Sequence, residues 1–279
     1  MIPSRLLGVE VVSARPVGGG CIADAQRVDL ADGRTVFTKS GANLPTGLLE
    51  VEADALRWLA AADAIGVPEV LGLTSDPELL VLAWVEQGRA TATTAERLGH
   101  GLARLHAAGA PGFGWRRDGF IGPLPQRNDP ADSWSDFWLT RRIEPLTRRA
   151  IDAGNLSAAA APLVDRLAAR LPDLAGPPEP PARVHGDLWS GNVLTDTSGE
   201  PWIVDPAAYG GHREVDLAML SLFGSPASAF FAAYEEVTPL ADGWRSRLQL
   251  WQLEPLLVHT VLFAGGYGAQ ALGVLRRFT

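Results

Sequence analysis

Residues 185–194 read His-Gly-Asp-Leu-Trp-Ser-Gly-Asn-Val-Leu, and residues 202–205 read Trp-Ile-Val-Asp. Asp187 lies five residues before Asn192, and Asn192 lies thirteen residues before Asp205. Two short strands here would bring these three polar side chains to one rim. Phosphoryl transfer needs a carboxylate to orient the attacking hydroxyl, and an amide oxygen and a second carboxylate to hold Mg²⁺ against the phosphates. The stretch predicts Asp187 as catalytic residue and Asn192 and Asp205 as metal ligands, with ATP and Mg²⁺ as cofactors.

A polar turn between two strands is the alternative interpretation, because Asp and Asn favour turns. The complete string, with Asp205 in register, favours the phosphoryl-transfer site. The interval from Asp187 to Asn192 equals the one in the catalytic loop of protein kinases, but Gly186 stands where those enzymes have Arg. This difference points away from protein kinases.

His-Gly-Asp followed by Asn resembles the small-molecule kinases of the aminoglycoside phosphotransferase and choline kinase group, which belong to the protein-kinase-like superfamily. With Trp189, the string is most similar to the fructosamine kinase, or ketosamine-3-kinase, family. Further strings resemble this family at residues 122–128, 251–257 and 263–267. The resemblance therefore covers nearly the whole chain.

Three strands are predicted near the N-terminus, at residues 10–17, 22–30 and 35–40. Three glycines join the first two strands: Gly18, Gly19 and Gly20. Adjacent glycines let backbone N–H groups approach phosphate oxygens, and a flexible hairpin is the alternative interpretation. Lys39, near the end of the third strand, strengthens the nucleotide interpretation, because a kinase needs an ammonium group beside the α- and β-phosphates.

Residues 46–63 have the periodicity of an amphipathic helix, and Glu52 lies on its apolar stripe. Burying this carboxylate is costly unless it is paired, and Lys39 is the partner that kinase architecture supplies. Glu50 lies about 200° around the helix from Glu52 and should face solvent. We therefore assign Lys39 and Glu52 together to the nucleotide site.

Two more strands are predicted at residues 70–73 and 79–85, and the second runs into a hinge. The hinge backbone at Trp84 and Val85 would bind adenine. Five antiparallel strands and one helix make the N-terminal lobe of a bilobal, protein-kinase-like α+β fold. We place this nucleotide-binding lobe at residues 1–86 and a mainly helical catalytic and substrate-binding lobe at residues 87–279.

The second half of the chain is rich in helical patterns. Helices are expected at residues 93–108, 133–150, 155–171, 227–234 and 244–262. A long loop is expected at residues 110–131, and the proline-rich run 176–181 should form an extended connector.

Several side chains are predicted to support the site. His185 and Asp216 would brace the catalytic loop, with Asp216 accepting backbone hydrogen bonds from it. Capping of its own helix is an equally simple role for Asp216. Trp189 would offer an aromatic face to a sugar, and His106 is expected to be a packing residue.

The resemblance implies that the chain phosphorylates the 3-hydroxyl of ketosamines, which are sugars joined to an amine by glycation, and so promotes protein deglycation. An aminoglycoside, choline or amino-alcohol kinase is one alternative. A non-catalytic nucleotide-binding module is another, although the presence of all five residues of the site argues against it: Lys39, Glu52, Asp187, Asn192 and Asp205.

The net charge is −8, from 24 Lys and Arg against 32 Asp and Glu. Without a polybasic run, nucleic acid and anionic membranes are poor partners. Neither a targeting segment nor a membrane span is recognisable, which predicts a cytoplasmic protein. The single cysteine, Cys21, excludes an intramolecular disulfide. It is an inert strand residue by default, but the family resemblance implies a redox role, so we expect a monomer or a Cys21-linked homodimer.

Overall fold

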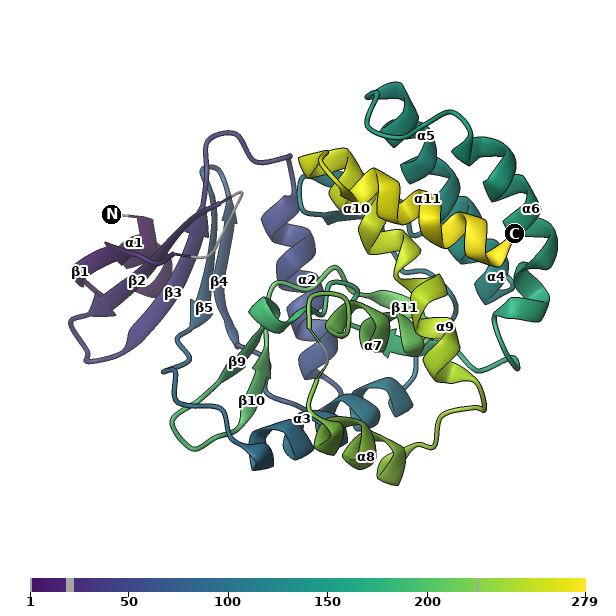
Figure 1. Cartoon of the computed structure of the whole chain (residues 1–279). Helices are drawn as coiled ribbons and strands as arrows, with labels where there is room; N and C mark the ends of the chain where they lie inside the picture. Colours follow the sequence, from purple (N-terminus) through teal and green to yellow (C-terminus); the bar gives the residue numbers. More distant parts are fainter. Residues whose placement is uncertain (1, 19–22, 225) are drawn as a thin grey trace.

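A five-stranded antiparallel sheet forms the N-terminal part of the chain, in the order β1-β2-β3-β5-β4. Its strands are β1 (Val11–Pro16), β2 (Asp24–Leu30), β3 (Thr35–Ser40), β4 (Val70–Ser75) and β5 (Glu78–Ala83). This computed structural model describes residues 2–18, 23–224 and 226–279. The five predicted antiparallel strands are confirmed, and the sheet stands at one end of the molecule (Figure 1).

One face of the sheet carries a small hydrophobic cluster that includes Val28, Val36 and Val81. The helix α1 (Ile2–Leu7) packs there, and its Leu6 covers Gly72 so closely that a Cβ at residue 72 would come 2.6 Å from the leucine. This lobe therefore contains, besides the predicted helix, a second and shorter helix that the sequence did not predict. A helix of six residues is too short to display the periodicity from which helices are predicted.

The opposite face of the sheet packs on α2 (Leu48–Ala60), which lies between the sheet and the helical part of the molecule (Figure 1). Leu49, Leu56 and Leu59 of this helix are fully buried. They belong to the same hydrophobic cluster as Leu102 and Leu105 of α3 (Ala92–Ala107). The two halves of the chain therefore share a continuous core.

The remainder of the chain is mainly helical, with three short two-stranded sheets. Its later helices are α4 (Trp134–Trp138), α5 (Glu144–Asp152), α6 (Ala160–Leu174), α7 (Glu214–Leu220), α8 (Ser228–Val237), α9 (Trp244–Trp251), α10 (Leu253–Phe263) and α11 (Tyr267–Phe278). The short strands pair as β6 (Gly119–Ile121) with β7 (Leu124–Gln126), β8 (Ala182–Val184) with β11 (Tyr209–Gly211), and β9 (Val193–Thr195) with β10 (Pro201–Ile203).

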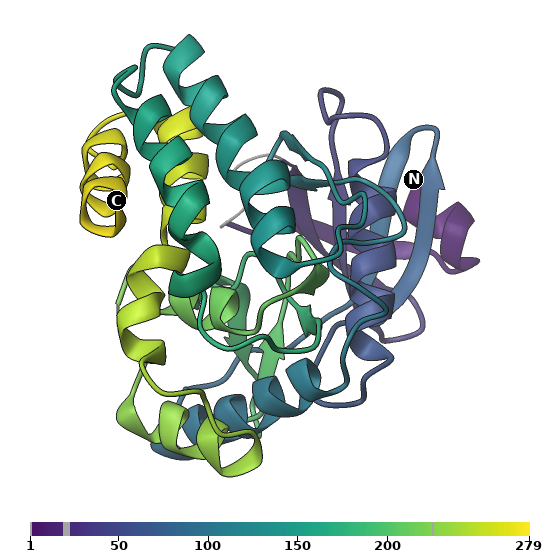
Figure 2. The ribbon, with the colours of Figure 1, turned by 90° about the vertical axis from the view of Figure 1, so that its right-hand side faces the viewer.

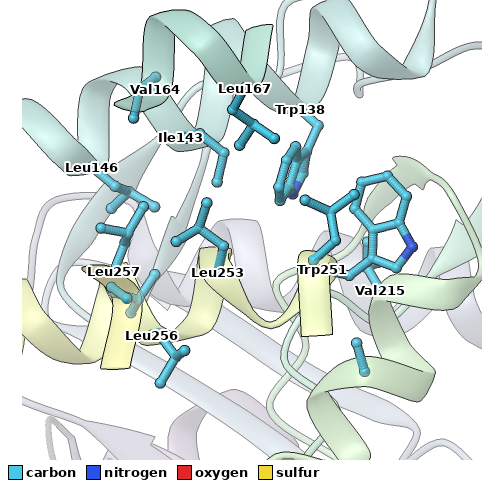
Figure 3. Packing of buried hydrophobic residues seen from close by; sticks show 14 of the residues in the cluster. Trp138, Ile143, Leu146, Val164, Leu167, Val215, Trp251, Leu253, Leu256 and Leu257 are labelled. Carbon is cyan, nitrogen blue, oxygen red and sulfur yellow. The ribbon is translucent and has the colours of Figure 1, made fainter. Parts of the chain in front are cut away.

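The hydrophobic core of the helical lobe lies where α5, α6 and α10 meet (Figure 3). Trp138 and Trp251 are fully buried there, with ring centroids 4.9 Å apart and the rings nearly perpendicular. A π-helical segment, Leu139–Ile143, joins α4 to α5, so that the predicted helix at residues 133–150 is one run with a wider turn inside it. Figure 2 shows these helices stacked on the side away from the sheet.

Several predicted boundaries in this lobe differ from the structure. The loop at residues 110–131 contains the β6–β7 hairpin, whose turn includes Gly122 at φ 56°. The helix at residues 244–262 is two helices, α9 and α10, that meet at Gln252. Short elements held by tertiary contacts carry little periodic signal, which explains these errors. Within the described ranges, no helix is long and apolar enough to cross a membrane.

Candidate active site

The catalytic loop runs from β8 to β9 and presents the predicted residues at one rim. Asn192 ends a short 3-10 helix, and its side-chain Nδ2 donates hydrogen bonds to the Asp187 carbonyl at 2.8 Å and to Asp187 Oδ2 at 3.3 Å. Asp205 follows β10, and Lys39 Nζ reaches it from the sheet at 2.5 Å. The structure thus brings together four of the five side chains that the sequence assigned to chemistry and nucleotide binding.

Asp187 has an unusual acidity. Burial, with the charge of Asp205 as the next cause, raises the pKa of Asp187 from 3.8 to about 7, although the hydrogen bond from Asn192 opposes the change. A carboxyl group with this pKa is poised to exchange a proton near neutral pH. Asp187 can therefore accept a proton from a hydroxyl group placed beside it.

Asp205 adopts a left-handed backbone conformation, with φ 56°, although it is not glycine. Such strain persists only where surrounding contacts hold it, and it concentrates at functional sites. The Lys39 ion pair is one of these contacts.

Lys39 also binds Glu52, at 2.7 Å, which confirms the predicted ion pair between β3 and α2. Burial alone would lower the pKa of Lys39, but the carboxylates of Glu52 and Asp205 raise it above its ordinary value. The ammonium group is therefore charged at all physiological pH values. Glu50, as predicted, is exposed, and it forms an ion pair with Arg117.

Asp216 holds the catalytic loop from behind. Its buried carboxylate accepts hydrogen bonds from the backbone N–H of His185 at 2.7 Å and of Gly186 at 2.9 Å, which confirms the predicted bracing role. It also lies 3.1 Å from His106 Nε2, and His106 Nδ1 lies 2.7 Å from the hydroxyl of Tyr234. This buried chain of hydrogen bonds fixes the loop to α3 and α8.

Gly186 is required by its surroundings. Its φ is 81°, and a Cβ at this position would come 2.3 Å from the carbonyl oxygen of Ala207. The loop therefore excludes the arginine that protein kinases carry here. The sequence showed the difference, and the structure supplies its steric cause.

His185 supports the loop as a neutral imidazole. Its Nδ1 accepts a hydrogen bond from the backbone N–H of Asp187 at 3.2 Å, so Nε2 carries the proton and donates to the Val204 carbonyl at 2.9 Å. Burial lowers the pKa of His185, which favours this neutral form. His185 thus links the backbone at Asp187 to the backbone at Val204, directly before Asp205.

Trp189 stands at the surface, two residues after Asp187, with 38% of its area exposed. Its ring lies across Gly191, where a Cβ would come 2.2 Å from the indole. The edge of Phe223 meets it with a centroid distance of 6.5 Å. An indole held this way can present a flat face to a ligand.

The hinge and the glycine loop are partly described. Trp84 Nε1 donates to Glu86 at 2.9 Å, Val85 is buried, and Gly88 N donates to the Thr195 carbonyl at 2.8 Å, which ties the hinge to β9. Among the described residues, no atom lies within 4 Å of the position that a Cβ at Gly18 would take. Gly19, Gly20 and Cys21 lie outside the described residues, so their roles stay predictions, as does adenine binding at the hinge.

The donor set suits a hard cation that is shared with phosphates. Asn192 Nδ2 is engaged by Asp187, so the amide oxygen is turned away from that residue, and among the described residues no hydrogen bond occupies it. Asp205 keeps 43% of its side chain exposed. The described part of the chain holds no group of three or more His, Cys, Asp or Glu that could bind a metal alone. Magnesium in kinases takes one or two protein oxygens together with phosphate oxygens, so these residues fit it.

A pocket opens beside Asp187. Its other walls are mostly apolar and come from β11, α7 and α10 in particular. It is lined by Ile121, Gly186, Asp187, Tyr209, Val215, Met219, Trp251, Glu254, Pro255, Val258 and His259. Sequence reasoning did not assign Glu254 or Met219 to the site. The similarity of residues 251–257 to the family was the signal that could have pointed to Glu254.

The fold and this arrangement of residues define an ATP-using phosphotransferase of the protein-kinase-like class. A sequence model of the fructosamine kinase family matches residues 4–279. The chain therefore belongs to the fructosamine kinase family.

Named relatives and a solved structure agree with this assignment. The chain is 40% identical to a probable ketoamine kinase of Synechocystis, over 94% of this chain and 89% of that protein. It is 33% identical to the ketosamine-3-kinase of Mus musculus, over 99% and 98%. The crystal structure of a fructosamine-3-kinase-like protein from Thermobifida fusca superposes with a TM-score of 0.93 at 44% identity, over 99% of this chain and 96% of that one.

Proposed function

We propose that this protein transfers the γ-phosphoryl group of ATP to the 3-hydroxyl of a ketosamine. The observation that carries the proposal is the position of Asp187, in the wall of a pocket and beside Asn192, Asp205 and Lys39. Family membership supplies the substrate class, because relatives bear the names ketosamine-3-kinase and protein-ribulosamine 3-kinase. A 3-phosphorylated adduct eliminates from its amine more readily, which supports a role in deglycation.

Asp187 orients the sugar hydroxyl and accepts its proton as the oxygen attacks phosphorus. The hydrogen bond from Asn192 Nδ2 to Oδ2 holds the carboxylate in one orientation. The backbone N–H of Asp187 is bound to His185, so the loop does not have to reorganise during the reaction. Such preorganisation lowers the barrier by placing the reacting atoms in line.

Asn192 and Asp205 would hold Mg²⁺, which when bound neutralises charge on the phosphates. Lys39 would contact the phosphates directly, and Glu52 keeps its ammonium group in place at 2.7 Å. Trp189 would stack on the sugar. Gly18, Gly19 and Gly20 would approach the phosphates, and Trp84 and Val85 the adenine.

A substrate panel tests the proposal. Purified protein is supplied with Mg²⁺·ATP and with fructosyl-lysine, ribulosyl-lysine, choline or an aminoglycoside, and ADP release is measured. We expect turnover with the ketosamines, a product phosphorylated at the 3-oxygen by NMR, and loss of turnover in Asp187→Asn with ATP binding retained. Preference for choline or the aminoglycoside would overturn the substrate assignment, and activity of Asp187→Asn within about tenfold of wild type would overturn the role of Asp187.

Further features of the protein stay proposals. The division into lobes at residues 86 and 87 and a cytoplasmic location rest on the sequence. So does the proposed disulfide between two copies of Cys21. Non-reducing gel electrophoresis after diamide treatment tests it, with Cys21→Ala as the control that should remain monomeric and active.

A further inference from the structure

One polar side chain of the pocket has no part in the mechanism above. Glu254, in the first turn of α10, lines the same pocket as Asp187 although only 10% of its side chain is exposed. Carboxylates are rarely buried to this degree unless they are paired or bind a ligand.

The contacts of Glu254 leave one oxygen available. Oε2 accepts a hydrogen bond from Trp138 Nε1 at 2.9 Å. Arg142 Nε lies 3.2 Å from Oε1, yet this nitrogen makes no hydrogen bond in the described part of the chain. The guanidinium group donates instead to the side chain of Asn128 at 2.7 Å and to the carbonyl of Arg127. Arg142 thus balances the charge of Glu254 without occupying the lone pairs of Oε1.

Arg142 is itself held rigidly. It projects from the π-helical segment, and its guanidinium group lies 4.3 Å from the ring centroid of Tyr209 and 4.7 Å from that of Phe137. π-helical turns occur frequently at functional sites. Here the wider turn directs a fully buried arginine toward the carboxylate, which fixes the position of Glu254.

The pocket has a closed end and an open end. We assign the two ends from the burial of the lining residues: Trp251 and Tyr209 are 1% exposed and Glu254 is also buried, so these three mark the closed end. His259 marks the open end, because its ring contacts the exposed rings of Phe223 and Phe263. The walls between the two ends are largely apolar, with Met219 and Val258 among them.

These two ends orient a ketosamine. The amine of the substrate continues into a lysine side chain or a whole protein, so it must leave through the open end. With the 3-hydroxyl at Asp187, the sugar carbons beyond C3 then extend toward the closed end. Their hydroxyl groups are hydrogen-bond donors, and a buried site rejects an analogue that leaves its polar group unpaired.

We propose that Oε1 of Glu254 accepts a hydrogen bond from a hydroxyl of the sugar tail, at C4, C5 or C6, and that Glu254 thereby selects the sugar of the ketosamine. The proposal rests on the proposed function. The acceptor is a buried carboxyl oxygen beside apolar walls, so the loss of this one hydrogen bond reduces kcat/KM about tenfold to a hundredfold.

The first experiment uses the wild-type protein. Its kcat/KM is measured for fructosyl-lysine and for analogues that lack one hydroxyl, at C4, C5 or C6. We expect kcat/KM to fall about tenfold or more for one analogue and to stay close to that of the parent compound for the other two. Equal losses for all three, or none, would overturn the proposal without any variant having to fold.

The second experiment adds Glu254→Gln, which retains the shape of the side chain. The single oxygen of the new amide is needed as the acceptor for Trp138 Nε1, so the NH2 group takes the place of Oε1 and cannot accept a hydrogen bond. We expect kcat/KM of this variant to fall about tenfold or more on the parent compound, and to fall little further on the analogue that the wild type discriminates, because the two changes remove the same interaction. The KM for ATP should not change. Additive losses would assign the discrimination to another residue and overturn the proposal.

Met219→Leu is the matched control, because it alters the apolar wall of the same pocket without removing a polar group. It should retain the discrimination between the analogues. Thermal unfolding of each variant reports whether Trp138 and Arg142 still hold the core. A wild type inactive on every ketosamine would refute the proposed function, whereas an active wild type without hydroxyl discrimination would refute this inference alone.

Discussion

Replacement of Asp187 by Asn should stabilise the protein while it abolishes turnover. Asp187 has an ordinary pKa of 3.8 that the folded chain raises to about 7, chiefly by burial and by the charge of Asp205. The folded state therefore disfavours the ionised carboxylate at the pH at which the enzyme needs it. Asn is neutral at every pH, and its amide oxygen can still accept the hydrogen bond from Asn192.

The sign and the pH range follow from proton linkage. Below about pH 4 the carboxyl group is protonated in both the folded and the unfolded chain, so Asp187 imposes no penalty. Between about pH 4 and pH 7 the unfolded chain releases this proton and the folded chain retains it. The free energy of unfolding of the wild type therefore falls with rising pH relative to the variant, and the difference levels off above about pH 7.

The size of the effect has an upper limit. A difference of about three pH units corresponds to about 4 kcal/mol, at ~1.4 kcal/mol per unit. Asp187 retains partial solvent exposure, which weakens its electrostatic interactions. We therefore expect the free energy of unfolding of Asp187→Asn to exceed that of the wild type by about 2 kcal/mol at pH 8. For comparison, most single substitutions destabilise a protein by about 1 kcal/mol.

Urea denaturation followed by tryptophan fluorescence measures this difference. Wild type and Asp187→Asn are compared from pH 4.5 to pH 8.5 with EDTA present and nucleotide absent, so that bound cations do not alter the acidity of Asp187. The reasoning would be refuted if the variant were no more stable than the wild type at pH 8. It would also be refuted if the difference in free energy of unfolding were the same at pH 4.5 and pH 8.

Asp196→Asn is the matched control with the opposite sign. A hydrogen bond from the side chain of Ser198 is the largest cause that lowers the pKa of Asp196, and a hydrogen bond from Trp202 is the next. Its ionised form therefore stabilises the fold above about pH 4, and this stabilisation is lost as the pH falls. The variant should be less stable than the wild type at pH 8, and the deficit should shrink in acid.

Three single variants and one double variant test other contacts of the site. Gly191→Ala should displace Trp189, because its Cβ would come 2.2 Å from the indole. The KM for the ketosamine should rise about tenfold while the KM for ATP stays unchanged. An unaltered ketosamine KM would exclude stacking of the sugar on Trp189. Asp216→Asn should lower kcat and destabilise the fold by about 1–3 kcal/mol, because two buried backbone donors lose a charged acceptor. Steady-state kinetics measures the first effect and urea denaturation the second. An unchanged kcat would contradict the bracing role of Asp216. Lys39→Met should destabilise the fold by about 3–5 kcal/mol, since Glu52 is left buried and unpaired, and adding Glu52→Gln should restore part of this stability. Titration calorimetry should find that both the single and the double variant have lost affinity for Mg²⁺·ATP. A double variant as unstable as the single one would refute the pairing argument.

The sequence alone predicted those features that depend on short intervals along the chain. Asp187 and Asn192 are five residues apart on one loop, so their proximity follows from local geometry. The strand at residues 35–40 was predicted with the bounds that the structure gives it. The pairing of Lys39 with Glu52 could be predicted because a carboxylate on an apolar stripe needs a cation, and kinase architecture supplies a lysine on the preceding strand as its partner.

The tertiary structure decided the features that depend on contacts between distant segments. The steric need for glycine at residue 186 comes from the carbonyl of Ala207, and the site of Glu254 comes from Trp138, 116 residues away. A buried carboxylate leaves no periodic or compositional trace that distinguishes a packing role from a binding role. Its function is set by which of its oxygens the surrounding side chains leave open, and that depends on how the helices pack around it.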